Sequence, residues 1–113
     1  MRTGAVRLMA IALLAAVQLM PQPRRAQASA LPEAIAAGHR MAVNWCAECH
    51  AVERGEVMSG KGPAFQRIAD MPATTELSLK VFLRSNHANM PNFIIAPGDA
   101  DEIARYILSL KRN

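Results

Sequence analysis

Five consecutive residues, Cys46-Ala47-Glu48-Cys49-His50, carry the most recognisable chemistry in this chain. The pattern C-x-x-C-H is typical of the site at which a c-type haem is attached. Two cysteines three positions apart lie on one side of a tight helical turn, so both sulfur atoms can form thioether bonds to the same edge of a porphyrin. The histidine that follows projects its imidazole toward the iron. We therefore predict one haem c, bound covalently through Cys46 and Cys49, with His50 as an iron ligand.

The same residues allow two other chemistries. Cys46 and Cys49 could act as a redox dithiol, but that motif normally lies in a βαβ unit, and the sequence shows no convincing strand. They could instead bind zinc with His50 and with His39 or His87. Adjacent Cys49 and His50 are poorly disposed to share one tetrahedral ion. A disulfide between the two cysteines would close too short a loop to stabilise the fold much.

The N-terminus has the features of a secretory signal. Arg2 and Arg7 come first, the apolar run 8–20 follows, and Ala26-Gln27-Ala28 matches the small-residue cleavage pattern. The apolar run is shorter than the roughly 20 residues that a transmembrane helix needs. An uncleaved anchor is the alternative interpretation.

We predict a Sec-type signal peptide at residues 1–28, with cleavage after Ala28 or, as the alternative, after Ala30. Residues 29–113 then form one small domain that is exported to the periplasm. The whole chain has 13 Lys and Arg against 9 Asp and Glu. Four of the basic residues and none of the acidic ones lie in the signal, so the mature part is formally neutral. Its charge therefore gives no reason to expect a nucleic-acid partner.

Helical periodicity runs through the mature part, and we predict an all-α fold. The expected helices cover residues 32–46, a short turn within 63–71, a segment capped by Thr74 or Thr75, and a last helix that opens at Asp99 with Glu102 in capping-box spacing. Residues 51–62 and 86–97 are expected to be loops. The predicted buried positions of the three longer helices are Ile35, Gly38, Ala42 and Trp45, then Leu79, Phe82 and Leu83, and finally Ile103, Tyr106, Ile107 and Leu110. His39 is expected to face solvent.

Met90 is the candidate for the second axial ligand of the iron. It lies in Asn89-Met90-Pro91, where the proline ring restricts the backbone of both residues and holds the sulfur on a stiff loop. The chain has seven methionines, and most methionines fill cores. Met90 is favoured because the other methionines lack this loop and proline setting, and His87 is its rival.

With these residues the chain resembles a small bacterial monohaem class I c-type cytochrome. In that family a glycine eight residues before the first haem cysteine lets the first and last helices cross closely, and Gly38 has this spacing from Cys46. Tyr106 matches the aromatic residue of the last helix. A Gly-Pro after the attachment site also matches, and the resemblance implies that the carbonyl of Pro63 accepts a hydrogen bond from His50. One departure is Ala42, where the family usually has an aromatic residue.

The resemblance implies the class I cytochrome c fold, three to four helices wrapped around one covalently bound haem. It implies a monomeric electron carrier and not an enzyme, with dehydrogenases or oxidases as redox partners. A dedicated electron-accepting subunit of a periplasmic dehydrogenase is an alternative, and so is a haem-based sensor if Met90 does not ligate. The surface beside Met90 is uncharged, so docking there is expected to depend weakly on salt. Arg54, Lys61 and Arg67 are interpreted as ordinary solvated charges.

Overall fold

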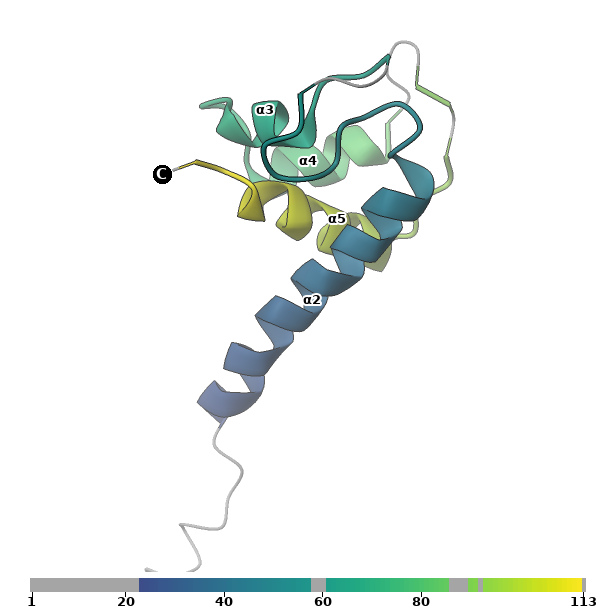
Figure 1. Cartoon of the computed structure of the whole chain (residues 1–113). Helices are drawn as coiled ribbons and strands as arrows, with labels where there is room; N and C mark the ends of the chain where they lie inside the picture. The colour runs from purple at the N-terminus through teal and green to yellow at the C-terminus, as the bar shows by residue number, and fades with distance from the viewer. Residues whose placement is uncertain (1–22, 58–60, 86–89, 92, 113) are drawn as a thin grey trace, which may run out of the picture.

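The computed structural model describes residues 23–57, 61–85, 90, 91 and 93–112. Over these residues the chain forms four α-helices and no strand, which confirms the all-α prediction. The helices are α2 (Pro23–Trp45), α3 (Phe65–Asp70), α4 (Glu76–Leu83) and α5 (Pro97–Ser109). Figure 1 shows α3, α4 and α5 gathered in one compact body, from which the N-terminal half of α2 projects. None of the helices formed by the described residues is long and apolar enough to cross a bilayer.

Helix α2 begins nine positions earlier than predicted, at Pro23 instead of Pro32. Proline is tolerated in a first helical turn because its missing N–H has no helical partner there. The alanine-rich sequence that follows Pro23 has high helix propensity and continues the helix. Pro32 then lies in the interior and leaves the carbonyl of Ala28 without its usual helical donor. Residues 1–22 of the expected signal peptide 1–28 lie outside the described residues, and α2 begins within its last six residues.

The closest approach in the fold is between α2 and α5, which share the most extensive contact between described helices. Gly38 is buried at this crossing. A Cβ atom built on Gly38 would lie 2.0 Å from the carbonyl oxygen of Glu102 and 2.9 Å from Cβ of Tyr106. Any side chain at position 38 would push the two helices apart. The close crossing that the resemblance implied therefore depends on glycine at this position.

The core is built around α5, which contacts α2, α3 and α4. The four positions predicted to be buried in the last helix are buried, three within α5 and Leu110 at its C-cap, and Ile103 and Ile107 are the largest side chains with almost no exposure. Of the other predicted core residues Ile35 and Leu83 are partly buried, and two are exposed. Trp45 is 42% exposed and Phe82 is 57% exposed. Each lies in the last turn of its helix, where the helical period continues although the side chain stays largely outside the core.

The two later helices differ in how well their starts were predicted. Thr75 caps α4 as expected, with its hydroxyl accepting from the N–H of Ser78 while the Ser78 hydroxyl accepts from the N–H of Thr75. Helix α5 starts at Pro97 and not at Asp99, so Asp99 lies in the first turn and makes no capping box with Glu102. Proline at the first position starts the helix because its backbone angle is already helical.

Candidate functional site

Residues 46–50 form a tight turn that continues α2. The N–H of Cys46 donates to the carbonyl of Ala42 at 2.9 Å, so helical hydrogen bonding extends one residue past the end of α2. The N–H groups of Cys49 and His50 both donate to the carbonyl of Cys46, at 3.1 and 2.9 Å. The turn thus holds both cysteines and the histidine in one compact unit. This unit follows directly on α2, the helix that packs closely against α5 at Gly38.

Both cysteines are free thiols. Cys46 is buried, and this burial raises the pKa of its thiol to about 11. Because the thiolate and not the thiol is the reactive form, Cys46 is a poor nucleophile at neutral pH, which argues against the dithiol alternative. Among the described residues no group of three or more His, Cys, Asp and Glu side chains is placed to hold a metal ion. The alternative zinc ligand His87 lies outside the described residues.

His50 is oriented by the backbone of Pro63. Its Nδ1 lies 2.7 Å from the carbonyl oxygen of Pro63, which is the hydrogen bond that the resemblance implied. A carbonyl can only accept, so Nδ1 carries the proton and Nε2 keeps a free lone pair. An imidazole in this tautomer is prepared to bind a metal through Nε2.

The loop fits closely against the ring of His50. A Cβ atom on Gly62 would lie 2.4 Å from Cε1 of His50, so the ring fits in this position only because residue 62 is glycine. The ring of Phe65 packs on that of His50, with the ring centres 5.3 Å apart. The N–H of Gly62 donates to the carbonyl of Cys49 at 2.8 Å, and this bond joins the loop directly to the cysteine turn.

Met90 lies in the described stretch before α5 and is half-buried. It follows residues 86–89 and precedes Asn92, which lie outside the described residues. His87, the alternative to Met90 as iron ligand, is one of these undescribed residues. The ligand roles of His50 and Met90 and the role of Pro63 toward a haem therefore stay predictions.

His39 does not simply face solvent as expected. Its Nε2 lies 2.6 Å from Oε1 of Glu53, and its ring packs on Tyr106 with ring centres 4.9 Å apart. The hydroxyl of Tyr106 donates to the carbonyl of Val52 at 2.7 Å. Burial is the main reason that the pKa of Tyr106 rises to about 12, and Glu53 adds to the effect. These contacts attach the chain segment after His50 to both α2 and α5.

Arg54 is not an ordinary solvated charge either. Its guanidinium donates to the carbonyls of Ser109 and Leu110, the last groups of α5. Carbonyls at a helix end lack helical donors, and a cation there also interacts favourably with the helix dipole. Sequence reasoning missed this contact because the partners lie more than 50 positions away. No local pattern indicates it.

The residues of the turn match the chemistry that a c-type haem requires. Two free thiols at C-x-x-C spacing supply the thioether sulfurs. One imidazole with a free Nε2 supplies an axial nitrogen. The glycine at position 62 makes space for that imidazole. Cys46, Cys49 and His50 would hold the group, with Pro63 supporting His50.

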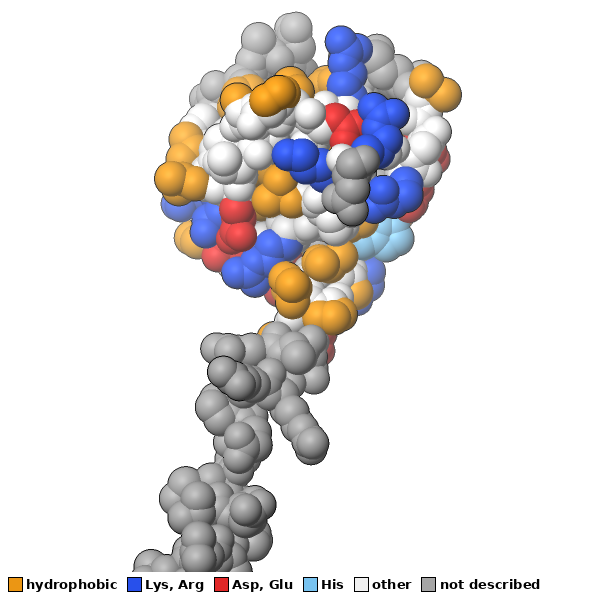
Figure 2. All heavy atoms as spheres, turned by 90° about the vertical axis from the view of Figure 1, so that its left-hand side faces the viewer, with side chains coloured by type: hydrophobic (Ala, Val, Ile, Leu, Met, Phe, Trp, Pro, Cys, Tyr) orange, Lys and Arg blue, Asp and Glu red, His pale blue; other side chains and the backbone are white. Residues whose placement is uncertain are grey.

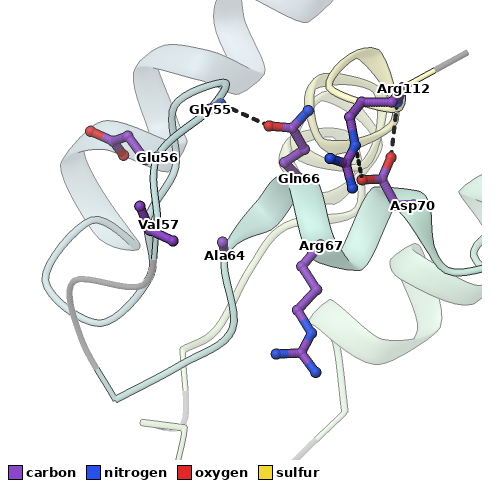
Figure 3. Close-up of a pocket in the computed structure, with 8 residues that line it drawn as sticks. All are labelled: Gly55, Glu56, Val57, Ala64, Gln66, Arg67, Asp70 and Arg112. Atoms are coloured by element: carbon purple, nitrogen blue, oxygen red, sulfur yellow. Dashed lines mark hydrogen bonds and ion pairs between the residues drawn. The ribbon is translucent and has the colours of Figure 1, made fainter.

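A separate groove of about 570 Å³ lies between the segment after His50, α3 and the C-terminal end of the chain. Its lining includes Val57, Ala64, Arg67 and Arg112, and none of the three motif residues. Figure 3 shows Arg112 paired with Asp70, and Arg67 extending from α3 away from that pair. Arg112 donates to Asp70 through its backbone N–H (2.9 Å) and through Nε (2.8 Å).

The chain belongs to the c-type cytochromes, the class that this turn and the crossing of α2 with α5 define. It is 38% identical over 91 residues to cytochrome c-552 of Bradyrhizobium diazoefficiens, a similarity that covers 76% of this chain and 88% of that protein. No family model and no solved structure matches the chain. As a member of this class the protein is a haem-containing electron carrier and not an enzyme.

Proposed function

We propose that this protein is a periplasmic one-electron carrier with a single haem c attached to Cys46 and Cys49, and with His50 and Met90 as axial ligands. The observation that carries the proposal is the hydrogen bond from His50 Nδ1 to the carbonyl of Pro63 at 2.7 Å, next to two free thiols on the same turn. When bound, the haem supplies an Fe(III)/Fe(II) couple that accepts or releases one electron.

The hydrogen bond to Pro63 gives His50 a defined role. It fixes the tautomer, holds the ring plane, and increases the basicity of Nε2, as such second-shell bonds do at other metal sites. The backbone at Gly62 and the ring of Phe65 both lie against the imidazole. A rigid ligand changes position little between two oxidation states, and this favours fast electron exchange.

Met90 supplies the sulfur ligand in this proposal. It is half-buried, and Pro91 stiffens the backbone on its C-terminal side. A thioether raises the reduction potential of a haem relative to a second imidazole. With both axial positions filled, no position is left at which a small molecule binds, so the residues support electron transfer and not sensing.

Absorption spectra of the matured protein test the ligand set. We expect a low-spin c-type spectrum with a far-red sulfur-to-iron band in the oxidised state. Met90→Ala should abolish that band and leave the covalent haem, because the sulfur is lost while both thioethers remain. Met71→Ala is the matched control, since Met71 is an exposed methionine (48%) on another element.

Three results would contradict the proposal. The far-red band could persist in Met90→Ala, or be missing already from the wild type, as it would be if His87 were the ligand. The reduced wild-type protein could bind carbon monoxide at neutral pH, which would indicate an open axial position and favour a sensor. The denatured matured protein could have the mass of the polypeptide alone, which would exclude covalent attachment.

The location follows from the predicted signal peptide. We propose that residues 1–28 are removed during export and that 29–113 function in the periplasm as a monomer. The N-terminal sequence of the exported protein tests this and should begin at Ser29, or at Leu31 if cleavage follows Ala30. A mature protein that retains Met1 would show that the leader remains as an anchor.

A further inference from the structure

Two helices hold the ends of the segment that contains Met90. Helix α4 ends at Leu83 and α5 begins at Pro97, so residues 84–96 connect them. The two helices pack against each other, and α4 contacts neither of the other described helices (Figure 1). The way in which α4 lies against α5 therefore determines where both ends of this segment are placed.

An ion pair joins α4 to α5 close to the points at which the segment leaves them. Nζ of Lys80, in the last turn of α4, lies 2.9 Å from Oδ1 of Asp101, in the second turn of α5. The two side chains are 33% and 35% exposed. Hydrogen bonding to Asp101 is the main reason that the pKa of Lys80 lies above its ordinary value. The pair thus closes the chain between positions 80 and 101 into a loop that contains Met90.

Two further contacts support this pair. Oε1 of Glu76 lies 3.7 Å from Nζ of Lys80 within α4 and 3.6 Å from Nε of Arg105 on α5. The four side chains therefore form one network in which acidic and basic groups alternate between the two helices. Isolated surface ion pairs contribute little to stability, but several charges in one network contribute more.

The apolar contact of α4 with the core is small. Of its eight residues, all of them described, Leu79 alone is buried, and Leu83 just before the C-cap is partly buried. The other large apolar side chains of the helix are exposed, namely Leu77 (70%), Val81 (59%) and Phe82 (57%). Hydrophobic stabilisation grows with the apolar area removed from water, so a helix with one buried side chain gains little from it. The ion pairs consequently carry a large share of the attachment of α4 to α5.

We propose that Lys80 and Asp101 are positioning residues for Met90, because their ion pair fixes α4 against α5 and thereby keeps the sulfur at the haem iron. The inference rests on the proposed function. Without the pair, the ends of the segment 84–96 are held less well, and the state in which the sulfur has left the iron becomes more populated.

Free imidazole can report that population. It binds the iron only when the sulfur is absent, so its apparent affinity rises in proportion to the fraction of molecules in that state. The exchange replaces one neutral ligand of the iron by another, and neither an electron nor a proton is transferred. Because imidazole is uncharged as a ligand, its binding is insensitive to the net charge of a variant.

Imidazole titration of the oxidised, haem-loaded protein tests the inference, with the far-red band as the signal of bound sulfur. Asp101→Asn should increase the apparent affinity for imidazole about two- to fivefold, the effect of losing a partly exposed ion pair. Lys80→Gln should have a similar effect, whereas Lys80→Arg keeps the charge and should remain close to the wild type. The double variant of Lys80→Gln and Asp101→Asn should exceed neither single variant by much, because both changes break the same contact.

Asp70→Asn is the matched control. It also neutralises an aspartate and breaks an ion pair, in which Oδ2 of Asp70 lies 2.8 Å from Nε of Arg112. This pair belongs to the side of the molecule with α3 and the C-terminal end, where Figure 2 shows acidic side chains among Lys and Arg side chains. It does not join α4 to α5. Asp70→Asn should therefore lower the free energy of unfolding, measured by urea denaturation, and leave the affinity for imidazole unchanged.

Equal affinities for imidazole in Asp101→Asn and Asp70→Asn would overturn the inference, because the ion pair between α4 and α5 would then have no specific effect on the sulfur. Fully additive effects of Lys80→Gln and Asp101→Asn would overturn it as well, since the two residues would act independently. A failure of the proposed function is recognised separately. In that case the wild-type protein already lacks the far-red band before any imidazole is added.

Discussion

A hydrogen bond orients the imidazole of His50, and the absence of a side chain at position 62 gives the ring its space. Pro63 supplies the acceptor at 2.7 Å, and Gly62 supplies the space. The hydrogen bond involves only the backbone of residue 63, whereas the space depends on the residue type at position 62. The two positions should therefore respond differently to substitution.

Gly62→Ala should displace the His50 ring. The added Cβ would meet Cε1 at 2.4 Å, a distance that neither the ring nor the loop can accept without moving. We expect a loss of about 1–3 kcal/mol in the free energy of unfolding, as is usual for overpacking, and a changed haem spectrum. Chemical denaturation and absorption spectroscopy measure the two effects.

Pro63→Ala is the comparison for that experiment. Alanine keeps the carbonyl that accepts from Nδ1, so the spectrum should stay close to that of the wild type. If Gly62→Ala left both stability and spectrum unchanged, the close contact between residue 62 and the imidazole would be wrong.

At the scale of helices, Gly38 determines how closely α2 and α5 approach. Gly38→Ala would place a methyl group 2.0 Å from the carbonyl oxygen of Glu102, which belongs to the backbone of α5 and cannot rotate away. We expect the free energy of unfolding to fall by about 3 kcal/mol, at the upper end of overpacking costs. Urea denaturation measures it. Gly98→Ala is the control, because a Cβ there meets nothing within 4 Å, and its stability should be unchanged or slightly higher.

Arg54 stabilises the end of α5 from a distant part of the chain. Arg54→Gln should lower the free energy of unfolding by about 1 kcal/mol, because the carbonyls of Ser109 and Leu110 lose a charged donor. Thermal or chemical denaturation measures the change. Lys61→Gln removes the same charge from an exposed residue that has no ion pair within the described structure, and should have little effect. Equal losses in the two variants would mean that net charge, and not the contact with α5, is responsible.

At the scale of the molecule, the Asp70–Arg112 pair ties the C-terminal end to α3. Hydrogen bonds from Arg112 are the main reason that the pKa of Asp70 lies below its ordinary value. Such a lowered pKa contributes stability at every pH above the ordinary value of about 4. That contribution is lost as the pH falls from there through the lowered pKa. Asp70→Asn should thus be less stable than the wild type at neutral pH, and the difference should shrink toward pH 3. A difference that does not depend on pH would show that the ion pair contributes nothing.

The parts of the structure that follow from local sequence were predictable, and those that need distant partners were not. The haem-attachment turn, the N-cap Thr75 and the buried stripe of α5 each depend on residues a few positions apart. The exposure of Trp45 and Phe82 depends on how the helices pack against one another, which the period of a single helix does not specify. The contacts of His39 and Arg54 join residues 14 and more than 50 positions apart. The helix was predicted only from residue 32, within the expected exported part, whereas α2 begins at Pro23, within the expected signal peptide.

The crossing at Gly38 joins the helix before the cysteine turn to the last helix of the chain. Among the described helices α2 packs against α5 alone, so it has no helix to pack against until residues 97–109 are present. A chain truncated before Pro97 would keep the haem-attachment sequence but would lack α5, and α2 could not pack into the fold that surrounds the haem.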